Sequence, residues 1–201
     1  MRRWLALFVA AAALAVPAAA VGASRPNFAH SYRGTVSGTL STGENGNVVK
    51  AQWKIAGLVF RLTKAQAFEG GFTGLYKVAR GTVSYSETET GTCTYSAGDK
   101  FGLAKALPHP NPSTPFALDQ DPLGRKTILG LINVNRKLKT TESCPDPGGG
   151  PPITNTRELS LPTLFDPGEA HWSPGRRLRH TNRQRDRSTR LIWHWDLKPG
   201  R

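Results

Sequence analysis

Apolar and polar side chains alternate along several stretches of this chain, and that period of two constrains the fold more than any other feature. The stretch Leu75–Tyr95 is rich in Tyr, Val and Thr, which suit a pleated, half-buried surface. Within it, Tyr76 and Val78 share one parity, whereas Val83 has the other. Successive side chains of a strand point to opposite faces, so this switch predicts a bulge or sharp bend at Gly81.

The polar run that follows predicts a hairpin tip. Ser86–Thr90 carries Glu87 and Glu89, which we expect to be exposed charges that keep a sheet edge soluble. Two carboxylates on one strand share a face, unlike a glycosidase pair, which flanks a cleft from different elements. Cys93 would then lie on the returning strand and face the same side as Tyr95.

An earlier hairpin is expected near the start of the folded part. His30–Leu40 and Val48–Phe60 both alternate like strands, and the turn between them contains the favourable pair Asn45-Gly46. One face of the second strand is polar and carries Lys50, Gln52 and Lys54. Its apolar face comprises Val49, Ala51, Trp53, Ile55 and Val59.

The rest of the chain predicts further strands between loops rich in proline and glycine. Residues 63–68 are compatible with one helical turn, whereas residues 107–125 and 145–152 are expected to be loops, because proline lacks the N–H that a central strand needs. The remaining strand candidates are Thr127–Leu138, covered on both faces, Ile153–Leu161, Arg176–Asn182, and a last strand with Leu191, Trp193, Trp195 and Leu197 on one face.

These patterns indicate an all-β protein, namely an antiparallel sandwich or barrel of about seven or eight strands with little helix. The pentapeptide RGTVS occurs twice, at Arg33–Ser37 and Arg80–Ser84. A match this short does not establish an internal repeat, because repeat folds need three or more copies.

The first residues predict a secretory signal peptide, residues 1–23. Two arginines precede the apolar run Trp4–Val16, and small residues follow it through Ala23. We expect cleavage after Ala23 or Ala20, which leaves residues 24–201 as a single secreted β domain. The alternative is an uncleaved anchor, which the shortness of the apolar run disfavours. No later stretch is apolar enough to cross a bilayer, so the predicted location is extracytoplasmic.

The two cysteines, Cys93 and Cys144, predict a disulfide, because two cysteines in an exported chain most simply pair with each other. The alternatives are two free thiols or a metal site. A metal site is disfavoured because the five histidines form no close pair near the cysteines. Asp119–Gly124 resembles the start of a calcium loop, but the closing carboxylate would fall on Gly130, so no metal is expected there.

Positive charge is concentrated near the C-terminal end. The formal net charge is +13, and residues 176–201 contain nine Lys/Arg against two Asp/Glu. If the segment 176–190 forms two strands joined by a turn, alternate arginines share a face and could neutralise sulfates, phosphates or other anions. The alternative is a solvated surface that keeps the protein soluble. The candidate anion-binding residues are Arg176, Arg177, Arg179, Arg183, Arg185, Arg187 and Arg190.

This segment favours a non-enzymatic role, in which the protein binds an anionic polymer or envelope surface. Nucleic acid is also a polyanion but is not favoured, because exported proteins more often meet envelope polymers or lipid headgroups. No cofactor is expected, and the sequence leaves the oligomeric state open.

Two other functions stay open. A barrel or cleft that binds a small ligand would be lined by aromatic side chains, and Trp172 is the ligand-contact candidate because it lies in an irregular segment. A hydrolase would use His109 on the proline-rich loop with Asp119 or Asp121 beside it. No motif supplies a nucleophile for that second alternative, since a GxSxG sequence is absent.

Overall fold

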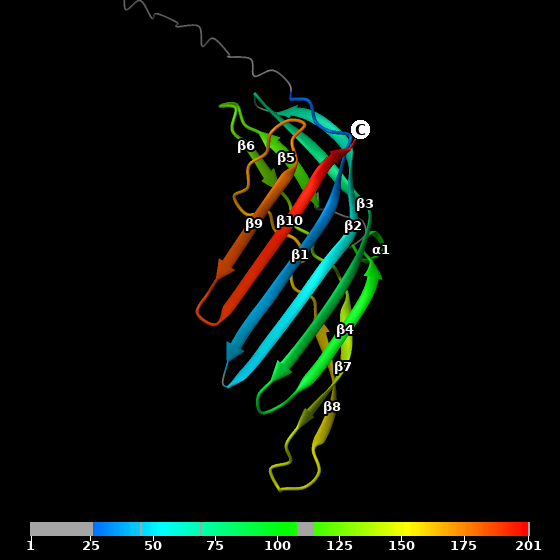
Figure 1. Ribbon diagram of the computed structural model, residues 1–201, viewed down its shortest axis with the longest axis vertical. Coiled ribbons are helices and arrows are strands. Elements are labelled where there is room, and N and C mark those ends of the chain that lie inside the picture. The colour runs from blue at the N-terminus through cyan, green and yellow to red at the C-terminus, as the bar shows by residue number, and fades with distance from the viewer. Residues whose placement is uncertain (1–25, 45, 69, 108–114, 201) are drawn as a thin grey trace, which may run out of the picture.

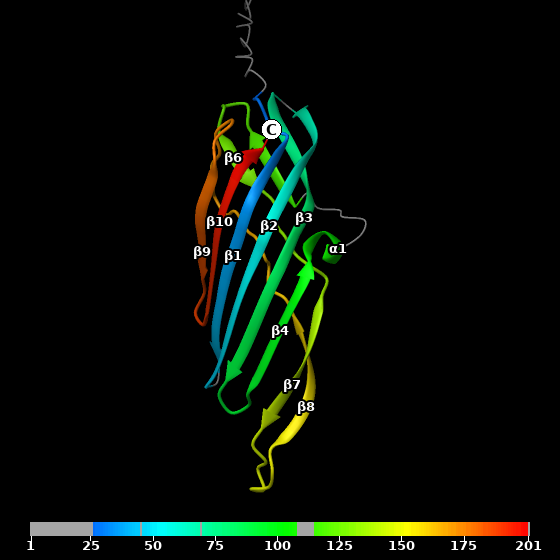
Figure 2. The same ribbon diagram turned by 45° about the vertical axis from the view of Figure 1, so that its right-hand side comes forward.

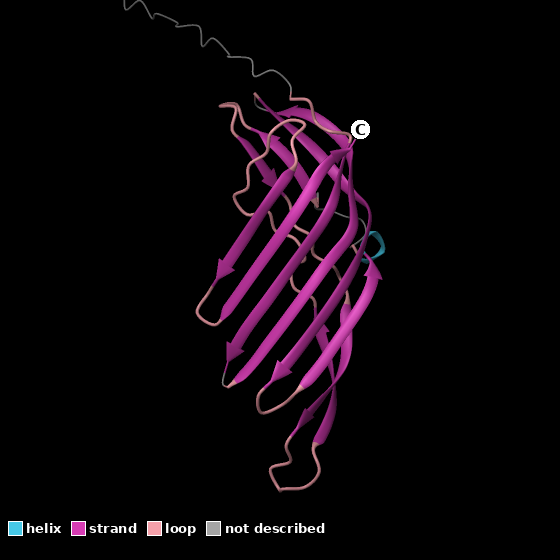
Figure 3. Ribbon diagram, in the orientation of Figure 1, coloured by secondary structure: helices cyan, strands magenta, loops and turns pink. Residues whose placement is uncertain are grey.

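The computed structural model describes residues 26–44, 46–68, 70–107 and 115–200. Most of its strands belong to one antiparallel sheet with the order β6-β5-β3-β2-β1-β10-β9, and β4 also pairs with β3 (Figures 1 and 3). The strands of this sheet are β1 (Ser31–Glu44), β2 (Asn47–Phe68), β3 (Gly71–Thr90), β4 (Tyr95–Gly102), β5 (Phe116–Gln120), β6 (Lys126–Leu129), β9 (Leu178–Arg185) and β10 (Thr189–Gly200). A separate ribbon pairs β7 (Lys137–Cys144) with β8 (Ile153–Ser160), and α1 (Leu103–Ala106) is a single turn.

The predicted all-β, antiparallel class with little helix is confirmed, but the sheet is neither a sandwich nor a closed barrel. It curls into a half-barrel that stays open, because β6 and β9 end the path of paired strands (Figure 2). The described residues form more strands than expected. The predicted loop 107–125 contains β5, and the predicted strand 127–138 divides into β6 and the start of β7. Among the described residues, no helix has the length and apolar character that crossing a membrane requires.

Strands β1, β2 and β3 form the centre of the sheet. The parity of β3 changes between Val78 and Val83 as predicted, but the extra residue on β3 is Ala79 and not Gly81. Opposite Gly81, the register between β2 and β3 shifts over Ala56–Val59. The two residues on either side of Val59 are fully buried in the core, whereas Val59 pairs with Arg33 and Arg80 on the other face. The predicted apolar face of β2 is therefore confirmed as far as Ile55. Beyond Ile55 the bulge turns the side chain of Val59 to the opposite face.

Two predictions for these strands are wrong. Thr63–Phe68 is not a helical turn but the end of β2, because it pairs with the first residues of β3 around a turn at Gly70. Strand pairing with a neighbour outweighs the weak intrinsic preference of so short a segment. Ser86–Thr90 is not a hairpin tip, since β3 runs through Thr90 and Glu87 and Glu89 are each only 7% exposed.

The core lies on the inner side of the curled sheet. The irregular segment 161–172 crosses that side and fills it with Leu164, Phe165 and Trp172. Two indole N–H groups of the sheet hold the segment in place: Trp53 donates to the carbonyl of Leu164 at 2.8 Å, and Trp193 donates to the carbonyl of Thr163 at 2.9 Å. The core positions expected for Trp53, Trp193 and Trp195 are confirmed.

The segment predicted as a strand covered on both faces, 127–138, is also corrected. Ile128 and Ile132 are buried, whereas Leu129 and Leu131 are exposed. Ile132 pairs with Phe165 of the inner segment through an isolated bridge, so the chain leaves the sheet at this point. Only one face is covered because the second layer here is a single irregular segment rather than another sheet.

The β7–β8 ribbon extends beyond the lower end of the sheet (Figure 2). The predicted disulfide between Cys93 and Cys144 is confirmed, and it joins the β3–β4 turn to the end of β7. Beside it, Thr94 and Ser143 exchange backbone hydrogen bonds of 2.9 Å. Residues 145–152 form the predicted loop at the tip of the ribbon.

Candidate anion-binding face

The β9–β10 hairpin sets the direction of the basic segment. On β10 the apolar side chains face the core, and the alternate residues therefore point outward. Register places Arg185 opposite Arg190, and Arg179 opposite Asp196, so β9 presents every second residue on the same outward side. The hydroxyl of Thr181 and Nδ1 of His194 share a hydrogen bond of 2.8 Å on this side, which agrees with that register.

The predicted arginines thus fall into two groups. Four of them occupy outward positions on the hairpin: Arg179, Arg183, Arg185 and Arg190. Arg176 and Arg177 precede β9, and Arg187 lies in the turn that Asp186 and Thr189 close with a backbone hydrogen bond of 2.9 Å. All seven side chains are exposed.

We call the exposed side of β9, β10, β1, β2, β3 and β4 the outer face. Its cations extend well beyond the segment 176–190, because cross-strand register places residues of β1 to β4 beside the arginines. One row runs from Arg185 through Arg190 and Ser41 to Lys50. The outer-face cations, all exposed, are Arg33, Lys50, Lys54, Arg61, Lys64, Lys77, Arg80, Lys100, Arg179, Arg183, Arg185, Arg190 and Lys198.

A single carboxylate, that of Asp196, stands among the described outward side chains of these six strands. It pairs with Arg177 through two hydrogen bonds, which hold the pKa of Asp196 below its usual range. Among the described residues, none of these outer-face cations forms an ion pair. The outer face therefore carries a large excess of positive charge.

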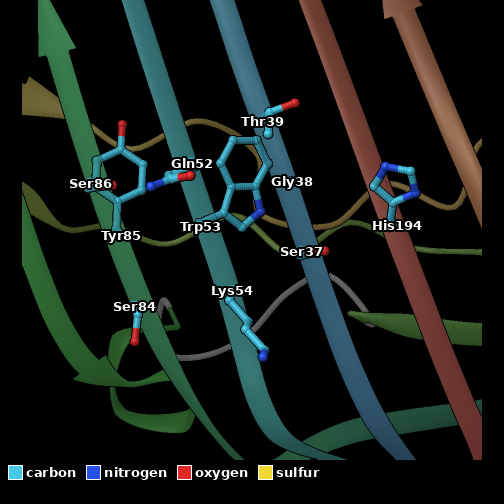
Figure 4. A pocket seen from close by; sticks show the side chains of 10 residues that line it. All are labelled: Ser37, Gly38, Thr39, Gln52, Trp53, Lys54, Ser84, Tyr85, Ser86 and His194. Atoms are coloured by element: carbon cyan, nitrogen blue, oxygen red, sulfur yellow. The ribbon is translucent and has the colours of Figure 1, made fainter.

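The outer face also contains shallow hollows lined by hydroxyl, amide and cationic groups. One hollow of about 450 Å³ lies over the middle of the sheet, where Ser37, Lys54 and Ser84 stand on three neighbouring strands (Figure 4). His194 and the buried residues Trp53 and Tyr85 also border it. Another, of about 370 Å³, is lined by three cations without an ion pair, by the Arg177–Asp196 pair and by apolar residues: Arg33, Arg80, Lys198, Arg177, Asp196, Leu58 and Val59.

Acidic groups gather instead where the β7–β8 ribbon meets β3 and β4. We call this cluster the ribbon junction; it consists of Tyr85, Glu87, Glu89, Tyr95, Asp99, Arg136, Glu142 and Arg157. The hydroxyls of Tyr85 and Tyr95 both donate to the carboxylate of Glu87. The expectation that Glu87 and Glu89 are exposed is wrong because both face inward, where tyrosine and arginine partners satisfy them.

Arginines connect the ribbon to the sheet at this junction. Arg157 of β8 donates to Glu89 at 2.7 Å and to Glu142 at 2.9 Å, and its guanidinium lies 5.0 Å from the ring centroid of Tyr95. Arg136 donates to Asp99 at 2.5 Å, which lowers the pKa of that carboxyl. Each of the four carboxylates of the junction therefore has an internal hydrogen-bond partner, unlike the cations of the outer face.

The other candidates lie away from the outer face or outside the described residues. Trp172 is only 4% exposed: its ring stacks on Phe28, and its N–H donates to the carbonyl of Asp119. His109 lies outside the described residues. Asp121 pairs with Arg125 within a turn. The described residues contain no group of three or more His, Cys, Asp or Glu that could hold a metal ion.

Sequence reasoning missed the cations of β1 to β4. A signal for them was present in the alternation of Lys50, Gln52 and Lys54, which predicts one polar face on β2. What the sequence did not reveal is that β1 pairs with β10, which brings that face beside the arginines.

Comparison of the chain with protein-family models, with curated proteins and with solved structures finds no match. The fold and the site by themselves define the class, an all-β protein whose open, curled sheet has one cationic, exposed side.

Proposed function

We propose that this protein is exported and binds an anionic polymer outside the cytoplasm through the outer face. The observation that carries the proposal is the direct opposition of Arg185 and Arg190, continued across the sheet by Lys50. Like charges directly opposite each other on neighbouring strands are destabilising. A bound polyanion offsets that repulsion and forms charge-assisted hydrogen bonds with the same guanidinium groups.

The composition of the outer face favours some polyanions over others. Phe68, at the end of β2, is the one Phe, Tyr or Trp among its described outward side chains, so the face offers no row of rings on which successive bases could stack. Membrane insertion likewise uses several large apolar or aromatic side chains together, whereas the exposed ones on this face, Val48 and Phe68, lie at opposite ends of β2. Rows of Ser, Thr and Gln beside the cations suit a polymer that carries hydroxyl groups as well as charge.

Export is supported by the predicted signal peptide, residues 1–23, which lies outside the described residues. The Cys93–Cys144 disulfide is a second support, because such bonds persist in oxidising compartments. N-terminal sequencing of the mature protein checks the expected cleavage after Ala23 or Ala20. Retention of the first residues would contradict it.

A salt titration tests the binding role. Heparin serves as the probe, and the triple variant R183Q/R185Q/R190Q removes three cations from the hairpin. We expect the native protein to bind heparin with an affinity that falls steeply as salt rises, because binding releases condensed counterions. The triple variant should bind at least about tenfold more weakly and show a shallower dependence on salt.

The control variant K105Q/K126Q/K139Q removes the same charge from α1, β6 and β7, which lie outside the outer face. It should keep most of the affinity. Equal losses in both triple variants would show that only net charge matters. Affinity independent of salt, or no binding at low salt, would overturn the proposal. Tighter binding to duplex DNA than to heparin would indicate that the anionic partner is a nucleic acid.

A further inference from the structure

The two copies of RGTVS occupy equivalent places on either side of β2. Arg33 of β1 and Arg80 of β3 both pair with Val59. Four residues further along each copy, Ser37 and Ser84 both pair with Lys54. Because β1 and β3 are both antiparallel to β2, the two copies run in the same direction and match residue by residue.

The copies also present the same groups to the same sides. Val36 and Val83 face the core, and each is 0% exposed. The alternate residues point to the outer face, so each copy contributes a guanidinium and two hydroxyl groups there. The pentapeptides therefore border the outward side of β2 with two similar rows of hydrogen-bond donors.

Between the two rows, β2 places Val59 level with the arginines and Lys54 level with the serines, and only the stretch between these two residues has little side-chain bulk. The bulge contains Ala56 and Gly57, and Gly57 has a positive φ of 60°. A side-chain carbon added at Gly57 would meet nothing within 4 Å, so the space above it is open. This glycine lines the hollow of about 370 Å³ together with Arg33 and Arg80, and the one carboxylate there, Asp196, is paired with Arg177.

We propose that the paired pentapeptides form an oxyanion site, which takes a phosphate or sulfate ester group over Gly57. Arg33 and Arg80 lie about two strand spacings apart, roughly 10 Å between Cα atoms, so both long side chains can reach one group between them. Guanidinium forks match the paired oxygens of such a group. Among the described residues neither arginine forms an ion pair, so both are available.

The outward side of β2 between the two pentapeptides suits a polymer that continues beyond that group. Lys54 lies about 13 Å along the strands from the arginines, flanked by Ser37 and Ser84 (Figure 4). Hydroxyl donors between two cationic ends fit a hydroxyl-rich chain with ester groups at intervals. The site deepens the proposed function and rests on it, since it assigns the chemistry of the bound group.

Binding requires one side chain to turn. The Arg33 side chain extends towards Gly200: its Nε atom lies 3.3 Å from the position that a Cβ atom on Gly200 would occupy. Arg33 is exposed, and rotamer changes of exposed side chains take picoseconds to nanoseconds. Closure of Arg33 on an anion therefore involves no change of the backbone.

The double variant R33Q/R80Q tests the site, with R61Q/K77Q as its matched control. The control pair is exposed, directly opposed on β2 and β3, and outside both pentapeptides. Calorimetry with heparin oligosaccharides and with inorganic polyphosphate distinguishes sulfate from phosphate. We expect R33Q/R80Q to bind the preferred probe at least about tenfold more weakly than the native protein, and the control less than about threefold.

A second variant changes the shape of the hollow rather than its charge. Gly57→Asn keeps a residue that tolerates positive φ but fills the open space, so we expect at least about threefold weaker binding. Titration of the native protein with inorganic phosphate or sulfate should shift the amide resonances of Gly57, Thr35 and Thr82 most. Shifts confined to β9 and β10 would overturn the site.

The outcomes separate this inference from the proposed function. If R33Q/R80Q and R61Q/K77Q lose equal affinity while R183Q/R185Q/R190Q loses much more, the oxyanion site is wrong and the role of the outer face stands. If the native protein binds neither probe at low salt, both are overturned.

Discussion

The ribbon junction and the outer face are the two regions where this molecule concentrates charge, and they handle it in opposite ways. At the junction Arg157 bridges Glu89 and Glu142, and Arg136 pairs with Asp99. On the outer face the described cations have no such partners, because the one carboxylate there, Asp196 of β10, pairs with Arg177, which precedes β9. Charges with internal partners hold elements of the fold together, whereas exposed charges of one sign are available to an external partner.

The comparison predicts that substitutions at the junction alter stability and leave anion binding unchanged, and that substitutions on the outer face do the reverse. The following changes test this separation, beginning with the largest effect.

The largest effect is expected at alkaline pH. Burial raises the pKa of Tyr32 to about 12, and burial also raises the pKa of Tyr76, Tyr85 and Tyr95, the last two further through Glu87. In the unfolded chain these groups lose their protons near pH 10, whereas the folded protein disfavours the ionised form. Stability is therefore complete below about pH 10 and falls as the pH rises further.

Tyrosinate absorbance and circular dichroism, followed together, measure this effect. All four tyrosines of the chain are buried, so no ionisation should precede unfolding. A tyrosine that ionises near pH 10 while the sheet signal is intact would contradict the packing described for it.

The next effect concerns the disulfide that ties the ribbon to the β3–β4 turn. The variant C93A/C144A should lower the free energy of unfolding by about 2–4 kcal/mol, because the unfolded chain gains freedom when the cross-link is lost. Urea denaturation measures it. Heparin affinity of the folded variant should match that of the native protein; a parallel loss would indicate that the ribbon belongs to the binding site.

A smaller loss is expected from Glu87→Ala. It leaves the hydroxyls of Tyr85 and Tyr95 without their acceptor in a buried site, which should cost roughly 2–3 kcal/mol in the free energy of unfolding. Thr88→Ala is the control because Thr88 is the next residue and is exposed on the outer face. Its effect should stay below about 0.5 kcal/mol. Equal effects in the two variants would refute the hydrogen-bonded role of Glu87.

The smallest effect has the opposite sign. Arg190→Glu replaces the repulsion between Arg185 and Arg190 by attraction, so the free energy of unfolding should rise by roughly 0.2–1 kcal/mol. Heparin affinity should fall at the same time. A variant that loses stability would show that the arginines hold the hairpin together rather than serve a partner.

The sequence predicted the elements whose signals are local. The turn at Gly46, the strand with Trp193 and Trp195, and the cysteine pair all follow from residue type and alternation, and the structure contains each of them. The switch of parity between Val78 and Val83 likewise predicted an irregular register, because a bulge is the local way to move an apolar set between faces.

The remaining features depend on pairing between distant segments. Glu87 looks like an exposed residue until Tyr95 and the ribbon are placed around it. The extent of the outer face depends on the β1–β10 pairing, which joins residues at opposite ends of the chain. Alternation of apolar and polar residues shows which side chains share a face of one strand, but it does not show which strands pair with each other. The arginines were therefore predicted as one segment and not as part of a wider face.

The position of β9 at the end of the sheet affects how two molecules of this protein can associate. An uncovered strand offers backbone groups to a second molecule, and sheets commonly guard such strands with charge. Two molecules that approached through β9 would bring Arg179, Arg183 and Arg185 against their counterparts. This electrostatic barrier weakens as the ionic strength rises, so growth of ribbons from edge to edge is most strongly opposed in dilute electrolyte.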